Sequence, residues 1–246
     1  MTKSKRHIYW ALGAILLLAC LCPVLLEAKG RIYLVSVGVA DYPGTTNDLK
    51  LPAEDARIIE WVFRKNGGST KLLLNSEATA QDVLTTMIDH FSQAKTDDII
   101  LLFFSGHGYE GGFVSYDRFM DYNEIRKALA TSKAKTKLIF ADACFSGKMR
   151  GDKKGSPSSF KDKNVLLFLS SRSNEVSQES PFMKNGFFTS ALQRALRGDA
   201  DANKDRIITA KELFDHVSTD VRKLTHDKQH PVMWGNFDNN LTVISW

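Results

Sequence analysis

The sequence contains a cysteine and a histidine whose neighbours suit nucleophilic chemistry. Cys144 lies in Asp-Ala-Cys-Phe-Ser-Gly at positions 142–147, and His107 lies in Ser-Gly-His-Gly at positions 105–108. Each motif closely follows an apolar run that is typical of a buried strand. A thiolate attacks carbonyl carbon readily, and a neighbouring histidine can remove and return the thiol proton. The two motifs together therefore predict a cysteine hydrolase.

Each motif also has an ordinary structural interpretation. A single cysteine at a strand end is often a small buried hydrophobic residue, and a single histidine in a loop often lies at the surface. The occurrence of both at strand ends of one predicted sheet favours catalysis. The other two cysteines, Cys20 and Cys22, lie in an N-terminal apolar segment, so a chain without this segment keeps Cys144 alone. A lone thiol in an oxidising compartment is a liability unless its chemistry is used.

The N-terminus has the pattern of an export signal. Basic residues up to Arg6 precede an almost uncharged stretch from Ile8 to Leu26. We expect residues 1–28 to be a signal peptide or a retained membrane anchor, since the stretch is near the lower length limit for a span. The run Leu17-Leu18-Ala19-Cys20 also resembles a lipoprotein signal. In each case the folded part is exported (periplasmic, secreted or membrane-anchored), and membrane contact is confined to this segment.

Residues 29–246 are long enough for one well-buried domain. Continuous apolar runs typical of strands buried on both faces occur at Ile32–Val37, Ile99–Phe104, Leu138–Phe140 and Val165–Leu169, with a shorter one at Lys71–Leu74. Helical periodicity occurs at Ala53–Lys65, Thr79–Ala94, Tyr122–Ala130, Phe187–Leu196 and Ala210–Leu224. This alternation predicts an α/β three-layer sandwich, with a mostly parallel central sheet and helices on both faces.

The predicted sheet determines where the two motifs meet. Ligands of open α/β sheets bind outside the carboxyl ends of the strands, where His107 and Cys144 would both lie if their strands are neighbours. Gly106 and Gly108 allow the backbone to bend sharply and to approach a substrate closely. The backbone N–H groups of Gly108 and Cys144 are therefore candidates for an oxyanion hole.

The charge distribution does not indicate nucleic-acid binding. The formal net charge is only +5, and the basic residues cluster in a loop rather than along a helix. That loop, 147–164, is rich in lysine, glycine and serine and too long for a plain connector. We expect it to be exposed.

Beyond these features, the sequence resembles the caspase-like cysteine peptidases. Phe103–Gly108 is similar to their histidine motif and Ile139–Gly147 to their cysteine motif. The resemblance extends from the first strand through Leu51–Ala56 and Gly186–Thr189 to Gln229–Val232, which is nearly the whole of residues 29–246. It implies a caspase-haemoglobinase-like fold, peptide or protein substrates, no cofactor for the chemistry, Cys144 as nucleophile and His107 as general acid/base.

The departures from animal caspases bear on specificity. Those enzymes carry Gln-Ala-Cys-x-Gly with the histidine about 50 residues upstream, whereas Asp142 replaces the glutamine here and the interval from His107 to Cys144 is 37 residues. An aspartate at this place resembles metacaspases and paracaspases. In those relatives it lines the pocket for the side chain before the scissile bond, together with an aspartate that matches Asp55. The resemblance therefore implies cleavage after Arg or Lys, with Glu179 as a weaker third acid. Asp55 otherwise reads as a first-turn residue favoured by the helix dipole.

Two further features suggest regulation. The loop 147–164 lies where caspase relatives are often cut, so self-cleavage within Lys148–Lys163 and a merely solvated loop are both open. Residues 201–212 have the oxygen-ligand spacing of a calcium-binding EF-hand loop, except that Arg206 occupies the glycine position and would be strained there. A bound Ca²⁺ and a helix-turn-helix that lost the metal both fit this pattern, and the ligands would be Asp201, Asn203, Asp205, Ile207, Thr209 and Glu212.

The sequence thus predicts an exported caspase-like cysteine endopeptidase. Two other functions remain open at this stage. One is a catalytically silent protein that uses the fold as a binding scaffold. The other is a hydrolase or transferase with the same catalytic pair that acts on small amides.

Overall fold

A computed structural model describes residues 30–109, 111–143, 165–171, 184–235 and 237–246. Its centre is a six-stranded sheet in the order β10-β8-β7-β3-β1-β2. All neighbouring pairs are parallel except β10 with β8. The strands are β1 (Ile32–Gly38), β2 (Ser69–Leu74), β3 (Ile99–Gly106), β7 (Thr136–Ala143), β8 (Val165–Leu169) and β10 (Val232–Gly235).

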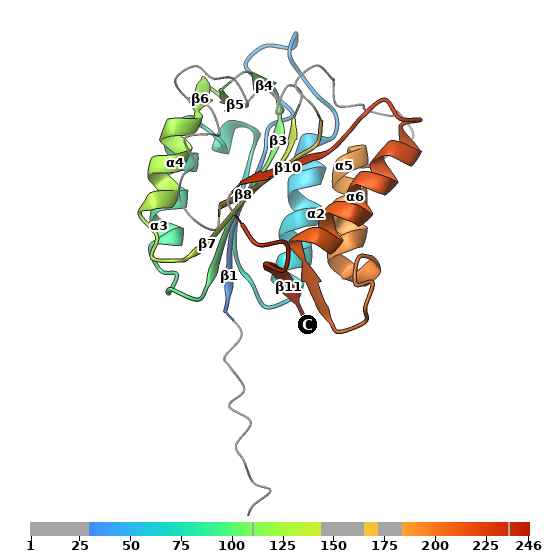
Figure 1. The fold of residues 1–246 in the computed structure, drawn as a ribbon. Helices are drawn as coiled ribbons and strands as arrows, with labels where there is room; N and C mark the ends of the chain where they lie inside the picture. The colour runs from blue at the N-terminus through green and yellow to red at the C-terminus, as the bar shows by residue number, and fades with distance from the viewer. Residues whose placement is uncertain (1–29, 110, 144–164, 172–183, 236) are drawn as a thin grey trace, which may run out of the picture.

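Helices cover both faces of this sheet, which confirms the predicted three-layer α/β sandwich (Figure 1). Helices α2, α5 and α6 lie on one face, and α3 and α4 lie on the other. Their bounds are α2 (Pro52–Lys65), α3 (Ala80–Phe91), α4 (Tyr122–Ala130), α5 (Phe187–Arg194) and α6 (Ala210–Leu224), with a 3₁₀ turn at Asn75–Glu77 and a π-helical stretch at Ala195–Asp199 after α5.

The alternation of side chains along each strand creates two separate cores. In β3, Leu101 and Phe103 pack toward α2, α5 and α6, whereas Leu102 and Phe104 pack toward α3 and α4. All four are fully buried, and each such side chain contributes about 1.5–3 kcal/mol. A strand buried on both faces must be apolar at consecutive positions, which is why the apolar runs predicted these strands.

Two small sheets complete the fold. One joins β4 (Gly108–Tyr109), β5 (Gly112–Val114) and β6 (Phe119–Asp121) just after His107, and the other pairs β9 (Ile207–Thr209) with β11 (Thr242–Ser245). Neither was predicted, because strands of two to four residues contain too little pattern to recognise.

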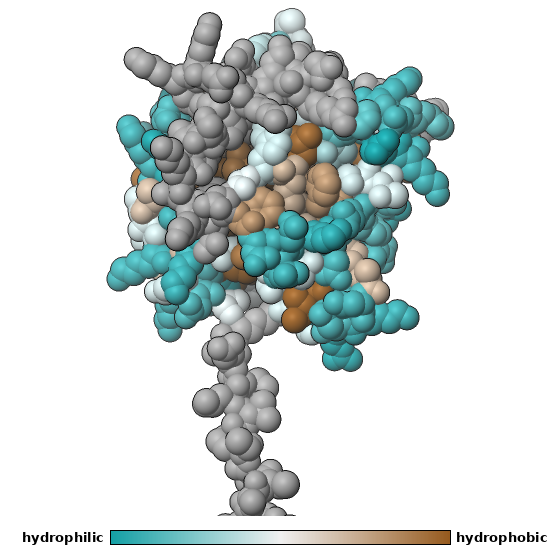
Figure 2. Space-filling view, in the orientation of Figure 1, coloured by the Kyte–Doolittle hydropathy of each residue, from teal (hydrophilic) through white to brown (hydrophobic). Residues whose placement is uncertain are grey.

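The surface is mostly hydrophilic. Figure 2 shows polar residues over the helices and apolar ones gathered around β10 on the viewed face. Among the residues that the structure describes, no helix has the length and apolar character needed to cross a bilayer.

Candidate active site

The carboxyl ends of β3 and β7 form the edge where the two predicted motifs meet. These strands are hydrogen-bonded neighbours, as the sequence interpretation required. Ser105 is registered with Asp142, and Gly106 is registered with Ala143. The last residue of β3 before His107 therefore lies beside the last described residue of β7.

The histidine at this edge is held at its backbone by a tyrosine. The His107 N–H donates to the Tyr42 hydroxyl oxygen at 2.9 Å, and this hydroxyl donates to the Val114 carbonyl at 3.2 Å. The two rings also pack together, with centroids 4.9 Å apart. Burial raises the pKa of the Tyr42 hydroxyl well above its ordinary value, offset only in part by the hydrogen bond from His107. The hydroxyl therefore stays protonated and keeps both hydrogen bonds.

The imidazole of His107 is oriented by a backbone carbonyl. Its Nε2 lies 2.8 Å from the carbonyl oxygen of Asn47. A carbonyl oxygen can only accept, so Nε2 must carry the proton and Nδ1 is left with the lone pair of the neutral ring. Tyr42 and Asn47 belong to one loop, which is closed by hydrogen bonds from Leu49 N–H to Ala40 O and from Tyr42 N–H to Asp48 Oδ1.

Two glycines beside the histidine have distinct roles. Gly106 has φ +154°, and a Cβ there would come 2.8 Å from the Tyr42 hydroxyl, so only glycine lets Tyr42 approach. Gly108 is registered with Phe113, while the Val114 N–H donates to the His107 carbonyl. This is the pattern of a non-hydrogen-bonded antiparallel pair, which directs the Gly108 N–H away from β5. Its direction is consistent with a donor to a bound substrate.

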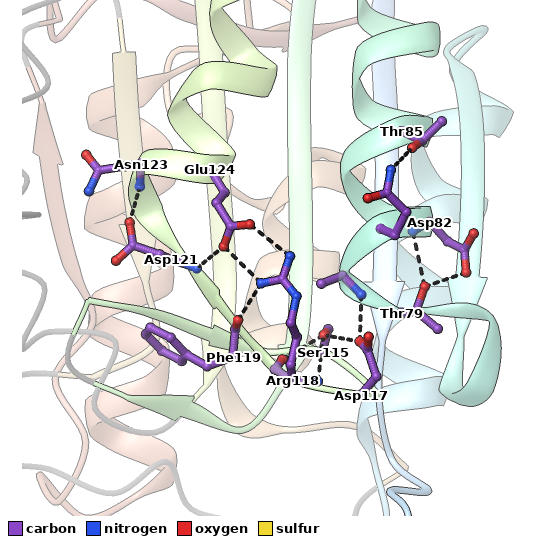
Figure 3. A network of polar contacts seen from close by, with 12 residues as sticks. Thr79, Asp82, Thr85, Ser115, Asp117, Arg118, Phe119, Asp121, Asn123 and Glu124 are labelled. Carbon is purple, nitrogen blue, oxygen red and sulfur yellow. Dashed lines mark hydrogen bonds and ion pairs between the residues drawn. The ribbon is translucent and has the colours of Figure 1, made fainter.

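A polar network anchors the small sheet that follows His107 (Figure 3). Asp117 accepts from the Ala80 N–H at the start of α3 at 2.8 Å and from the Ser115 hydroxyl at 2.9 Å. Arg118 donates two hydrogen bonds to Glu124 of α4, at 3.0 and 2.8 Å. The β5–β6 connection is thereby fixed to the first turns of two helices, which also fixes the strand partner of the His107 carbonyl.

The two aspartates predicted to select a basic side chain lie together under the same edge. Asp55 is in the first turn of α2 and Asp142 is near the end of β7, and both are buried, with 2% and 8% exposed. A Cβ built on Gly186 would lie 2.4 Å from Asp142 Oδ2 and 3.4 Å from Asp55 Oδ2. Gly186 therefore lies against both carboxylates, and a side chain at this position would have to displace the Asp142 carboxylate.

Neutral groups donate hydrogen bonds to both carboxylates. Asp55 accepts from the Gly186 N–H and Asn185 Nδ2, each at 3.0 Å, and from the Ser105 hydroxyl at 2.9 Å. Asp142 accepts from the Thr189 N–H at 3.1 Å and its hydroxyl at 2.8 Å.

The pKa of Asp55 is unusually high for a carboxyl group. Burial, and next the charge of Asp142, raise the pKa of Asp55 to about 8, although hydrogen bonds from Asn185, Ser105 and Gly186 act in the opposite direction. Burial and a second carboxylate nearby both make ionisation of Asp55 costly. Asp55 therefore favours its protonated form at neutral pH, and a cation bound beside it would favour the ionised form.

The EF-hand-like loop adopts a folded turn whose side chains point inward. Asp201 accepts from the N–H groups of Asp205 and Arg206 at 3.2 and 3.0 Å. Arg206 has φ +66°, the strained conformation expected where this loop type prefers glycine. Glu212 caps α6 by accepting from the Thr209 N–H and hydroxyl. Within the described residues, no group of three or more His, Cys, Asp or Glu is arranged to hold a metal.

The fit of this loop to a calcium ion is therefore partial. Asn203 and Asp205 belong to the same turn, where Asn203 Oδ1 accepts from the Asp205 N–H at 2.9 Å and Asp205 Oδ1 accepts from the Ile207 N–H at 2.8 Å. The carboxylate of Glu212, the expected sixth ligand, is engaged with Thr209.

Four predicted features lie outside the described residues, namely the N-terminal segment 1–28, Cys144, the loop 147–164 and Glu179. Conversely, the structure identifies contributors that the sequence interpretation missed. Tyr42 and Asn185 had no recognisable signal, because their roles depend on contacts between segments distant in sequence. Ser105 belonged to the quoted histidine motif, but its hydrogen bond to Asp55 could not be inferred from it. Thr189 belonged to a quoted motif, but its hydrogen bonds to Asp142 could not be inferred from it.

Comparison with known proteins agrees with this arrangement. The sequence profile of the caspase domain matches residues 33–241. The chain belongs to the caspase domain family. None of the functionally curated proteins compared with the chain matches its sequence.

Solved structures are similar in fold. A protein from Geobacter sulfurreducens superposes with a TM-score of 0.65 at 16% identity, over 85% of this chain and 94% of that one. Caspase-1 from Spodoptera frugiperda also has a TM-score of 0.65 at 16% identity, over 87% of this chain and 89% of that one. The caspase domain is a cysteine-peptidase fold, so peptides or proteins are the class of substrate it implies.

Proposed function

We propose that this caspase-domain chain is an exported cysteine endopeptidase that cleaves after Arg or Lys. The observation that carries the proposal is the edge formed by β3 and β7. His107 follows a residue registered with Ala143, its Nε2 proton is committed to Asn47, and the two buried aspartates lie under the same edge. These features support the proposed base and cation pocket, and they place the residue before Cys144 beside the residue before His107.

In the proposed reaction Cys144 is the nucleophile. Nδ1 of His107 takes the thiol proton, and the thiolate attacks the scissile carbonyl carbon. The N–H groups of Gly108 and Cys144 stabilise the oxyanion. The protonated imidazole then gives its proton to the departing amine. Water, deprotonated by the same imidazole, hydrolyses the thioester, and the thiol is regenerated.

The specificity rests on Asp55 and Asp142. A guanidinium or ammonium group beside them would compensate the negative charge of the carboxylates and favour ionisation of Asp55, whose pKa is raised. Because both carboxylates are almost fully buried, a substrate side chain reaches them only if residues that cover them move. An aspartate side chain would be repelled. Glu179 is proposed as an additional acid.

The nucleophile can be tested with a peptidyl electrophile that carries arginine next to the reactive carbon. We expect covalent labelling at Cys144, faster than that of a free thiol, and loss of labelling in Cys144→Ala. A His107→Ala variant should react slowly. Labelling of Cys144 no faster than a free thiol would favour a catalytically silent scaffold, and labelling only by small amide-like electrophiles would favour a different hydrolase.

We also propose that Ca²⁺ modulates the enzyme through Asp201, Asn203, Asp205, the Ile207 carbonyl, Thr209 and Glu212. The turn at Asp201 and the positive φ of Arg206 support it, and Glu212 would have to leave Thr209. Calorimetric titration of the full chain should detect Ca²⁺ binding that Glu212→Gln weakens. An equal affinity in Glu212→Gln, or no heat of binding, would contradict the proposal.

Export and self-processing complete the proposal. The apolar segment Ile8–Leu26 directs the chain out of the cytoplasm, and the lysine-rich loop 147–164 supplies bonds that match the proposed specificity. After prolonged incubation, mass spectrometry of wild type should show two fragments that result from cleavage within Lys148–Lys163. The Cys144→Ala variant should keep the mass of the uncleaved chain. Identical intact masses would exclude self-cleavage.

A further inference from the structure

One end of the molecule, here called the base, contains the amino ends of the parallel strands. Ile32 of β1 is registered with Ile99 of β3, which is registered with Thr136 of β7. The chain enters β1 through Gly30, so the apolar N-terminal segment is joined to the molecule at the base. The end of the chain lies at the same end of the molecule, opposite the edge that bears His107 (Figure 1).

Two tryptophans lie together at the base. Trp61 is 36% exposed and Trp246 is 46% exposed, and they line one shallow pocket with Lys65 and Arg197. The Arg197 guanidinium lies 5.8 Å from the centroid of the Trp61 ring. Asn66 lines this pocket and also the neighbouring one, which is formed around Gly30. The tryptophans therefore adjoin the point where the N-terminal segment begins.

Basic side chains form a rim around the base. Exposed members flank the strand starts and the ends of α2 and α5: Arg31, Lys65, Lys95, Lys133, Lys135 and Arg197. Of the nearby acids, Asp97 pairs with Lys135 at 3.8 Å, and Asp98 is buried and accepts from two backbone N–H groups. The loop 199–206 adds acidic and basic residues in similar number. The strand starts thus present mainly positive charge.

The N-terminal segment restricts how far the base can lie from a membrane. Only Glu27, Ala28 and Lys29 separate Leu26 from Gly30. At about 3.5 Å per residue, Gly30 lies within about 14 Å of the end of the apolar stretch. The polar headgroup layer of one leaflet is about 5–8 Å thick. If the stretch remains in a bilayer, the base must lie at or just above the headgroups.

We propose that the base docks on an anionic phospholipid surface, with Trp61 and Trp246 among the headgroups and the basic rim paired with lipid phosphates. Tryptophan and basic side chains are the residues that favour the membrane interface, and each exposed cation near an anionic leaflet contributes about 1 kcal/mol. This inference rests on the proposal that residues 1–28 are retained as an anchor, and it does not depend on peptidase activity.

The docking sets the orientation of the catalytic edge. β3 has eight residues between the base and His107, which at about 3.3 Å per residue holds the edge about 26 Å above the base. The peptidase site then opens away from the membrane, toward soluble substrates or long extramembrane segments. The sequence alone had assigned membrane contact only to the N-terminal segment.

Tryptophan fluorescence of the full chain in vesicles tests this docking. The chain has four tryptophans, so a Trp10→Phe, Trp234→Phe background leaves Trp61 and Trp246 as the emitters. The vesicles contain phosphatidylglycerol and a phosphatidylcholine brominated near the headgroup end of its acyl chains. We expect these bromines to quench most of the emission, and quenching to weaken when phosphatidylglycerol is omitted.

A matched variant reports on the opposite end. In the same background, Trp61→Phe and Trp246→Phe are combined with Tyr109→Trp, because Tyr109 is 62% exposed and lies two residues after His107. This reporter should not be quenched. Equal quenching at both ends, or none at the base, would overturn the proposal. The proposal would also be overturned if N-terminal sequencing showed that the mature chain begins near Lys29, because the anchor on which it rests would then be absent. Neither readout uses catalysis, so an inactive chain leaves the test intact.

Discussion

At the scale of single residues, the position of His107 depends on Tyr42. The tyrosine hydroxyl accepts from the His107 N–H, donates to Val114 and stays protonated because it is buried. Without the hydroxyl, a partly buried N–H loses its acceptor, a penalty of about 1 kcal/mol. The loss of this hydrogen bond would destabilise the backbone of His107 and so make the position of its imidazole less well defined.

We therefore predict that Tyr42→Phe lowers kcat by roughly 10-fold, since about 1.4 kcal/mol of barrier corresponds to that factor. KM should change little, because Tyr42 is not placed near the acidic pair. Steady-state kinetics with an arginyl peptide measure both. The matched control is Tyr109→Phe, whose exposed hydroxyl has no such role. A parallel fall in kcat for both variants would contradict the assignment.

The raised pKa of Asp55 lowers the free energy of unfolding at high pH. Its pKa is about 8 in the folded protein, against an ordinary value of 3.8. Between these values the folded state holds more protons than the unfolded state, so stability falls as pH rises through this window. Below about pH 4 the carboxyl is neutral in both states and the penalty vanishes.

We predict that Asp55→Asn stabilises the protein at pH 8–9 and not at acidic pH, while it abolishes cleavage after Arg and Lys. For a domain of this size each 1 kcal/mol corresponds to about 2–4 °C in Tm. Thermal melts across pH measure the effect. Asp89→Asn, on the exposed face of α3, should show no pH-dependent gain. A lower Tm for Asp55→Asn than for wild type at pH 9 would contradict the raised pKa of Asp55.

At the scale of elements, the small sheet β4–β5–β6 is supported by the bidentate pair of Arg118 and Glu124. Arg118→Gln removes both hydrogen bonds to α4 and loosens the β5–β6 connection next to His107. We predict about a 3- to 10-fold fall in kcat with a small loss of stability, since bidentate pairs add geometric definition more than energy.

The matched control for that prediction is Arg64→Gln. Arg64 pairs with Glu60 on α2 at 2.9 Å, at the end of the helix remote from the site. An ion pair of this kind contributes about 0.3–0.5 kcal/mol. Equal activity of wild type and Arg118→Gln, measured beside this control, would show that the network does not support catalysis.

The sequence predicted elements well where local chemistry defines them. Helix α4 begins and ends as predicted, because Asp121 and Glu124 form a capping box at its start. The predicted helix starting at Thr79 corresponds to α3, which Thr79 caps by accepting from the Asp82 N–H. Strand β7 proved longer than the apolar run Leu138–Phe140, since polar residues at its ends pair in the sheet. The antiparallel β10 was missed, because its pairing depends on tertiary contacts and not on local pattern.

At the scale of the whole molecule, the fold gives the two ends of the sheet different tasks. The carboxyl ends bring together His107, Gly106 and the acidic pair from segments far apart in sequence. The sequence placed His107 at this edge from strand order, but Asp55 was linked to Asp142 only through resemblance to caspase relatives. Asn47 was beyond prediction, because its carbonyl contacts the imidazole only through tertiary folding.

The most direct test of the central claim compares fluorogenic peptides ending in Arg, Lys and Asp, with wild type and Cys144→Ala, in the presence and absence of Ca²⁺. Our account predicts cleavage after Arg and Lys only, lost in Cys144→Ala and altered by Ca²⁺. Cleavage after Asp alone would contradict the role of Asp55 and Asp142, and undiminished cleavage by Cys144→Ala would contradict the nucleophile.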